Sequence, residues 1–274
     1  EPCWLDAYRF WFKRELADQC EYVLVDTAAL SQTIIDKPPE PEAITFKQGA
    51  EKSAVSPDGQ WEVFCRDHNL VLRVLSNSQE KALTKDGEPH YGYGTVSDFL
   101  ARDMYPDGQV PPAVLWSPDS RYLAVQRIDE RQVRDMPLVQ NVPPNDEVRP
   151  VFDSYKMAFP GDTHVPLASL CVIELSSGEI MPIDRLPSYV GFVEMNAVQW
   201  GEDHRLYFIE QTRDRNTVRL VCFDPVDCSD RVLIEEKRQE PGIIYPSPFP
   251  FGSPIFSVLA ERNEFIWYSH RDGW

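Results

Sequence analysis

The sequence predicts an all-β fold, a partial β-propeller, from two repeated turn phrases and the short apolar segments around them. Ser56-Pro57-Asp58-Gly59 and Trp116-Ser117-Pro118-Asp119-Ser120 each lie between two apolar segments of strand length. Proline fixes φ and Asp-Gly or Asp-Ser supplies a tight reversal, so each phrase is typical of a β-hairpin turn. Because one small sheet cannot bury its own faces, a strand–turn–strand unit that recurs along a chain indicates a radial β-repeat.

Short strand candidates follow one another along the chain, separated by turn residues. The first two, residues 9–13 and 21–25, are separated by a gap of hairpin size. Only residues 95–104 favour a helix, and a short one. The other strand candidates are residues 60–64, 69–74, 121–125, 170–175, 180–183, 196–200, 205–210, 217–223, 254–258 and 264–269.

Two segments interrupt the repeat and are expected to be inserted loops. Residues 88–112 and 133–166 are rich in Pro, Asp and Gly. Long loops in a compact domain usually carry a function or contact a partner. No change of composition marks a domain boundary, so we expect residues 1–274 to form a single β-propeller region.

Composition and charge exclude several classes of function. A formal net charge of −17 argues against nucleic acid as a partner, because phosphate binding needs clustered Lys and Arg. The same charge fits either attraction of a cationic group such as a peptide amine or simple solubility of the surface. No apolar run is long enough to span a bilayer. We expect no cofactor, since neither a phosphate loop nor a dinucleotide fingerprint occurs.

The six cysteines do not form a metal site or an evident disulfide framework. They include no CxxC pair, and no histidine is spaced near them as a zinc ligand would be. Cys65 and Cys171 lie in apolar segments and are interpreted as buried thiols. Cys222 and Cys228 flank a turn and would pair across a hairpin in an oxidising compartment, or stay reduced. The sequence leaves both the pairing and the compartment open.

No catalytic machinery is evident in the sequence. Gly-x-Ser-x-Gly is absent, so there is no nucleophile elbow, and HExxH is absent as well. Glu235-Glu236 precedes Lys237-Arg238 and is interpreted as a solvated strand end rather than an acid–base pair. We therefore expect no catalytic residue in this chain. The five histidines lie beside turn residues and are interpreted as exposed loop side chains: His68, His90, His164, His204 and His270.

Several motifs occur in an order that resembles a known family. They are residues 10–15 (FWFKRE), 22–26 (YVLVD), the turn at 56–59, 67–71 (DHNLV), 87–94 (GEPHYGYG), 115–120 (LWSPDS), 127–130 (RIDE) and 155–162 (YKMAFPGD). In this order they resemble the N-terminal β-propeller of the dipeptidyl peptidase IV family, within the prolyl oligopeptidase-like serine peptidases. The resemblance covers nearly the whole chain.

The resemblance implies an eight-bladed propeller that caps a C-terminal α/β-hydrolase domain with a Ser-Asp-His triad. This chain would hold about five to six blades' worth of strands, be truncated at its C-terminal end and lack the hydrolase domain. Its function would be that of the non-catalytic propeller portion of a serine exopeptidase, gating access and positioning short peptides for proteolysis. The alternative is a stand-alone propeller that binds a protein or peptide without enzymatic activity.

The same resemblance implies substrate-binding residues. In the family a glutamate pair in an insertion binds the free amine of the peptide, because two carboxylates in a partly desolvated pocket hold an ammonium group. Residues 94–103 contain no adjacent glutamates, and Asp98 and Asp103 are the acids that would bind the amine or else cap a helix. Arg102 is expected to neutralise part of the Asp103 charge. This departure leaves dipeptide-releasing specificity open.

An arginine early in the family's propeller reaches the backbone carbonyl of the substrate. Arg14 is its approximate match here, and a surface arginine at a strand end is the alternative. The partners implied are a short peptide substrate through the full-length enzyme, the C-terminal α/β-hydrolase domain and, since family members are commonly dimers, a second copy of the chain.

Overall fold

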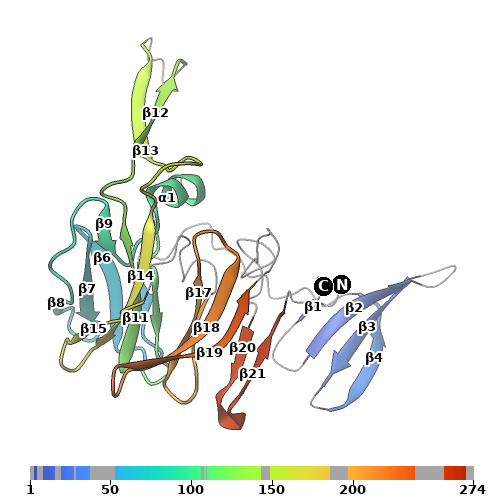
Figure 1. The fold of residues 1–274 in the computed structure, drawn as a ribbon. Coiled ribbons are helices and arrows are strands. Elements are labelled where there is room, and N and C mark those ends of the chain that lie inside the picture. Colours follow the sequence, from blue (N-terminus) through green and yellow to red (C-terminus); the bar gives the residue numbers. More distant parts are fainter. Residues whose placement is uncertain are drawn as a thin grey trace. The chain divides into compact units, whose positions relative to one another are not determined.

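The chain forms two compact units, Glu1–Ala50 and Glu51–Trp274, in the computed structural model. Within them the described residues form antiparallel strands, one α-helix and one 3-10 helix (Figure 1). The structure describes residues 3–4, 9–15, 20–27, 29–37, 53–105, 108, 110–142, 149–185, 197–237 and 256–269. Residues 196, 254 and 255 of the expected strands, His270 and parts of the two insertions lie outside these ranges.

The first unit contains a four-stranded meander in which each strand pairs with the next. The expected hairpin of residues 9–13 and 21–25 is confirmed, in a register that places Arg14 opposite Glu21. Val23 is buried in the middle of its strand. The four strands are β1 (Cys3–Trp4), β2 (Arg9–Glu15), β3 (Cys20–Asp26) and β4 (Ser31–Ile35).

The second unit repeats a sheet of four antiparallel strands, and the sheets stand side by side in chain order (Figure 1). The first sheet contains β5 (Ala54–Val55), β6 (Trp61–Arg66), β7 (Asn69–Val74) and β8 (Glu80–Ala82). The second contains β10 (Val114–Trp116), β11 (Tyr122–Asp129), β14 (Leu167–Glu174) and β15 (Ile180–Pro182), with β9 (Tyr91–Tyr93) added beside β11.

The third sheet has the same form, and a two-stranded sheet follows it. The third sheet contains β16 (Val198–Trp200), β17 (Leu206–Gln211), β18 (Thr217–Asp224) and β19 (Ser229–Lys237). The two-stranded sheet contains β20 (Phe256–Leu259) and β21 (Glu264–Trp267), with the 3-10 helix η1 (Ala260–Arg262) between them.

The two turn phrases form hairpin turns with the same hydrogen bonds. Ser56 Oγ donates to Asp58 Oδ1 and Ser117 Oγ donates to Asp119 Oδ1, each at 2.6 Å. In both turns the serine backbone N–H donates to a carbonyl five residues later, at 2.9 Å. The side chains therefore close each reversal locally, and the prediction made from these phrases is confirmed.

Apolar side chains pack between successive sheets. In β11, Leu123 and Val125 belong to a cluster shared with the first sheet, whereas Tyr122 and Ala124 belong to one shared with the third. Alternate residues of a strand point to opposite faces, so one strand can supply both clusters. A further cluster joins the third sheet to β20 and β21. The second and third sheets are thus buried on both faces.

Two tryptophans link the first strands of successive sheets. The indole Nε1–H of Trp116 in β10 donates to the carbonyl of Ala54 in β5 at 3.2 Å. In the next sheet Trp200 of β16 donates in the same way to the carbonyl of Leu115 in β10 at 3.0 Å. The repetition of this bond shows that the sheets are related by a common packing geometry.

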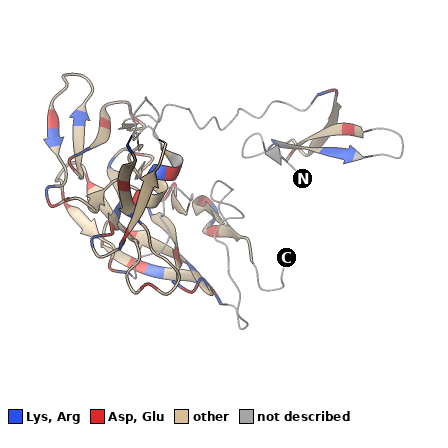
Figure 2. Cartoon of the chain, turned by 90° about the horizontal axis from the view of Figure 1, so that it is seen from above, with Lys and Arg blue, Asp and Glu red and all other residues tan. Residues whose placement is uncertain are grey.

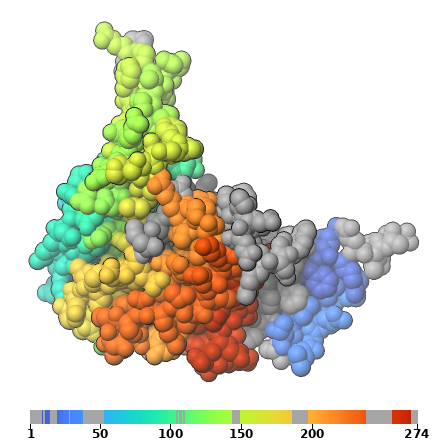
Figure 3. All heavy atoms as spheres, in the orientation of Figure 1, coloured from blue at the N-terminus to red at the C-terminus, as the bar shows by residue number. Residues whose placement is uncertain are grey.

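The two insertions contain regular structure rather than the expected loops. Residues 88–112 contain β9 and the helix α1 (Asp98–Met104), which lies within the helix expected at 95–104. Residues 133–166 contain β12 (Asp135–Gln140) and β13 (Val151–Lys156), a hairpin that projects from the second unit (Figures 1 and 3). Pro137 fits there because a two-stranded ribbon has edges that need no backbone donor.

The interpretation of Glu235-Glu236 as a solvated strand end is wrong for Glu236. Glu235 lies opposite Arg219 in β18 and pairs with its guanidinium. Glu236 is only 2% exposed, and its Oε2 accepts the indole N–H of Trp267 at 2.8 Å. Trp267 packs against the apolar cluster of the third sheet, which brings β21 over this residue.

The cysteines divide between buried and exposed positions. Cys171 is buried as expected. Cys65 is an exposed residue of β6, but its Sγ donates to the carbonyls of Tyr93 and Gly94, and burial raises the pKa of this thiol to about 11. Cys222 and Cys228 are both free thiols. The strand register places Cys222 opposite Arg231, while Cys228 lies in the turn between β18 and β19.

We expect Trp116→Phe to destabilise the chain more than Trp61→Phe. Both changes remove similar ring volume. Of these two tryptophans, Trp116 is the one whose indole N–H donates to another sheet among the described residues. Loss of this bond between two sheets should lower the free energy of unfolding by about 1 kcal/mol beyond the control. Urea denaturation followed by circular dichroism measures the difference. Equal losses in the two variants would contradict a stabilising role for this bond.

Candidate functional site

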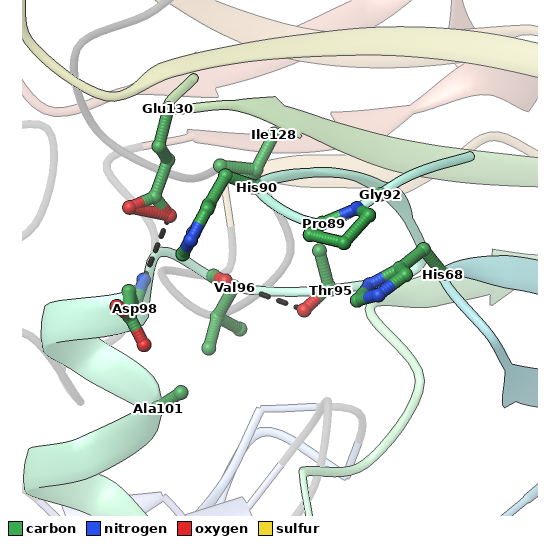
Figure 4. Close-up of a pocket in the computed structure, with 10 residues that line it drawn as sticks. All are labelled: His68, Pro89, His90, Gly92, Thr95, Val96, Asp98, Ala101, Ile128 and Glu130. Atoms are coloured by element: carbon green, nitrogen blue, oxygen red, sulfur yellow. Dashed lines mark hydrogen bonds between the residues drawn. The ribbon is translucent and has the colours of Figure 1, made fainter. Parts of the chain in front are cut away.

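A cavity of about 200 Å³ lies at the start of α1 (Figure 4). Its walls come from the β6–β7 turn, the segment before β9, residues 95–101 and the end of β11. Two carboxylates and two imidazoles line it, together with apolar side chains that include Val96: Asp98, Glu130, His68 and His90. Four segments that are distant in the sequence therefore meet around this cavity.

The backbone around the cavity has several constrained positions. His68 and His90 have φ values of 65° and 62°, in the left-handed region. Gly94 also has a positive φ, of 62°, and a Cβ there would lie 2.8 Å from Leu70 Cδ2, so glycine is required. His68, His90, His164 and His204 are exposed as expected.

Glu130 is a buried carboxylate with one satisfied and one unsatisfied oxygen. Its side chain belongs to a residue that is 3% exposed, and Oε1 accepts the backbone N–H of Asp98 at 2.7 Å (Figure 4). Oε2 has no hydrogen-bond partner among the described residues. Burial raises the pKa of Glu130 to about 7, because an ionised carboxylate loses hydration there.

Hydrogen bonds on both sides of Glu130 hold its backbone in place. Its N–H donates to the carbonyl of His90 at 2.8 Å, and its carbonyl accepts the N–H of Val133 at 2.9 Å. Ser97, the N-cap residue of α1, makes no side-chain capping bond. Glu130 therefore takes the place of a local cap and joins α1 to the end of β11.

Asp98 lines the cavity and also connects α1 to the projecting hairpin. Its Oδ2 accepts the backbone N–H of Lys156, the last residue of β13, at 2.8 Å. Lys156 Nζ in turn lies 3.1 Å from Asp135 Oδ1 and 2.9 Å from the carbonyl of Val133. Asp98 thus serves as a structural acceptor as well as a cavity residue.

The other predicted site residues lie away from this cavity. Asp103 is exposed on α1 and does not line the cavity. Arg102 was expected to neutralise part of the Asp103 charge, but it pairs with Asp153 of β13 instead. Arg14 lies in the first unit, where its guanidinium pairs with Glu21 on the neighbouring strand. Of the three predicted residues, the structure brings Asp98 to the cavity.

Sequence reasoning did not single out Glu130 as a site residue. It lies in the motif at residues 127–130, at the end of an apolar strand, where an acidic residue is ordinarily solvated. Its burial depends on α1 and on the segment around His90, which are distant in the sequence. No local pattern contains that information.

The cavity suits a cationic ligand better than catalysis. The unpaired oxygen of a buried carboxylate is a strong acceptor for a charged donor such as an ammonium group.

Over the part of the chain that the structure describes, no cluster of His, Cys, Asp and Glu could hold a metal ion. Acidic and basic residues are interspersed on the described strands and turns (Figure 2). None of the described helices has the length and apolar character of a membrane span.

Comparison with known protein families assigns the chain to one of them. A family model described as the dipeptidyl peptidase IV (DPP IV) N-terminal region matches residues 17–274. The chain belongs to this family. Two curated relatives are named probable dipeptidyl-aminopeptidase B: one from Colletotrichum graminicola is 28% identical over 185 residues, and one from Penicillium rubens is 26% identical over 184 residues. The matches cover 62% and 63% of this chain, and 19% and 20% of those relatives.

A solved structure confirms the fold class of this dipeptidyl peptidase IV N-terminal region. The crystal structure of Porphyromonas gingivalis dipeptidyl peptidase 4 matches with a TM-score of 0.55 and 14% sequence identity, over 85% of this chain and 32% of that one. The predicted all-β, partial propeller architecture is thus confirmed. The chain spans about a fifth of the length of the curated relatives it matches.

Glu130→Gln should stabilise the chain in a pH-dependent manner. The pKa of Glu130 is raised from 4.5 in the unfolded chain to about 7 in the fold, so the wild type loses stability as pH rises through that interval. Glutamine cannot ionise. We therefore expect Glu130→Gln to raise the free energy of unfolding more at pH 8 than at pH 5, by roughly 1–3 kcal/mol. Thermal unfolding at the two pH values measures it, with the exposed Glu179→Gln as control. The same effect of Glu130→Gln at both values would contradict a buried, protonated carboxyl.

Proposed function

We propose that this chain is the propeller portion of a dipeptidyl aminopeptidase. In the whole protein it would gate access and position short peptides for proteolysis by a C-terminal α/β-hydrolase domain. The observation that carries this proposal is the family match over residues 17–274. The names of the curated relatives support a peptidase, and stacked sheets with loops at the strand ends supply a rigid frame for positioning. Residues 1–274 would be one propeller region of that enzyme, which would act as a homodimer.

The cavity at α1 supports a role in binding the amino terminus of the peptide. The insertion contains no adjacent glutamates, but Glu130 and Asp98 bring two carboxylates to the cavity from different elements. Glu130 Oε2 has no partner among the described residues, and an ammonium group would supply one. An arriving cation would also favour the ionised carboxylate over the protonated one.

The remaining predicted residues have supporting roles in this proposal. Asp103 is exposed on the same helix as Asp98 and would attract the amine before it reaches the cavity. Arg14 would donate to a backbone carbonyl of the peptide, and its guanidinium would then have to be shared with Glu21.

Binding of a short proline-containing peptide should depend on its free amine. We expect the chain to bind the free-amine peptide about tenfold more tightly than its N-acetylated twin, because acetylation removes the charged donor. Glu130→Gln should abolish this preference, whereas Glu179→Gln should retain it. Isothermal titration calorimetry at pH 8 measures both. Equal affinity of the wild type for the two peptides would overturn the assignment of the cavity to the amine.

The chain alone should lack the chemistry of a serine peptidase. We expect no hydrolysis of proline-containing dipeptide chromogenic substrates and no labelling by a fluorophosphonate probe, because the sequence contains no Gly-x-Ser-x-Gly elbow. Mass spectrometry of the probe-treated chain is the measurement. A covalent adduct on any serine would show that the propeller portion carries a nucleophile of its own.

A further inference from the structure

A second cavity, of about 620 Å³, lies between the end of β11, the loop that leads into β14 and the turn between β17 and β18. Its lining contrasts with that of the cavity at α1. The cationic side chains Arg131 and Arg213 line it together with His164, and Asp129 is the acid among its lining residues.

Arg213 is held in place without being neutralised. Its Nη1 and Nη2 donate to the backbone carbonyls of Thr163 and Asp162, at 3.2 Å and 2.5 Å. Carbonyl groups carry no net charge, and among the described residues Arg213 contacts no carboxylate. A guanidinium has five N–H donors, so further donors stay available to a ligand.

Arg131 has a different role in the cavity wall. It pairs with Asp129 Oδ2 at 2.7 Å and with Glu88 Oε1 at 2.8 Å, so its charge is already compensated. Its guanidinium also lies 3.8 Å from the centre of the Tyr91 ring. Asp129, the acid in the lining, is therefore already paired with Arg131. The charge of Arg213 is the one that no carboxylate of the described lining compensates.

Apolar side chains also contribute to the lining of the cavity. Val133 and Val165 line it and are 3% and 9% exposed. Low polarity beside a cation strengthens its attraction for an anion, because less water screens the pair. His164 is exposed at the same cavity and adds a second nitrogen donor, with positive charge when it is protonated.

We propose that this cavity binds a carboxylate of a peptide, with Arg213 as the principal donor and His164 as the second. A guanidinium fits a carboxylate with two parallel hydrogen bonds, which accounts for the choice of ligand. Glu130 lines the cavity at α1 and its chain neighbours Asp129 and Arg131 line this one, so the two cavities adjoin one short segment. The proposal rests on peptide binding by the propeller and adds a preference for an anionic group.

Three N-acetylated tetrapeptides test the proposal without involving the amine cavity. The first two share one sequence and end in a free carboxylate or an amide, and the third is the amide with its last residue replaced by glutamate. Because all three lack a free amine, failure of the amine assignment cannot mimic failure here. Fluorescence polarisation with the 274-residue chain reports their affinities.

We expect the wild type to bind the free acid about tenfold more tightly than the amide, and Arg213→Gln to remove that difference. Arg134→Gln is the control, because the Arg134 side chain is 82% exposed and does not line the cavity. This variant should retain the preference for the free acid over the amide. Tight binding of the glutamate amide would show that the cavity accepts the carboxylate of an acidic side chain. Weak binding of this peptide would show that the cavity requires the C-terminal carboxylate.

Equal affinity of the wild type for acid and amide would overturn the proposal, as would an unchanged preference in Arg213→Gln. Displacement of the free acid by an equal concentration of inorganic phosphate would also overturn it, since the site would then accept any small anion. Arg213 is exposed, so the variant is expected to fold, and its melting temperature verifies this.

Discussion

The burial of both faces of the second and third sheets is the constraint on which the second unit depends. A sheet of four short strands is too small to hide its apolar side chains alone, and here β11 contributes Leu123 to one neighbour and Ala124 to the other. The second and third sheets therefore each need both the sheet before and the sheet after them. The bonds from Trp116 and Trp200 to the preceding first strands set the offset between sheets, because each indole must reach one particular carbonyl.

This stacking determines where functional groups can lie. Because the faces of these sheets are covered by neighbouring sheets, polar groups that a ligand can reach lie at the strand ends and in the insertions. Glu130 shows how such a group acquires unusual chemistry. It follows β11 directly, and the segment of His90 and the start of α1 enclose it, which raises the pKa of its carboxyl to about 7. A strand end that is ordinarily solvated thus becomes a desolvated acceptor.

Opposite charges are arranged around one short segment of the chain. Glu130 lines the cavity at α1, while Arg131 and the more distant Arg213 line the second cavity. The net charge of −17 hides this arrangement, since most described arginines are paired with carboxylates. Arg73 and Arg219, for example, pair with glutamates of neighbouring strands. Arg213 differs in being held by backbone carbonyls, and this difference rather than total charge distinguishes a candidate ligand site from a solvated surface.

The sequence by itself determined the elements whose information is local. The serine–aspartate turns follow from side chains that contact residues a few positions away. The alternating strands and the short helix at residues 98–104 follow from the local periodicity of apolar residues. Only the tertiary structure decided the burial of Glu130 and Glu236, the course of residues 135–156 as a projecting hairpin and the availability of Arg213. In each case the deciding contact comes from a segment distant in the chain, and desolvation depends on all the neighbours of a group at once.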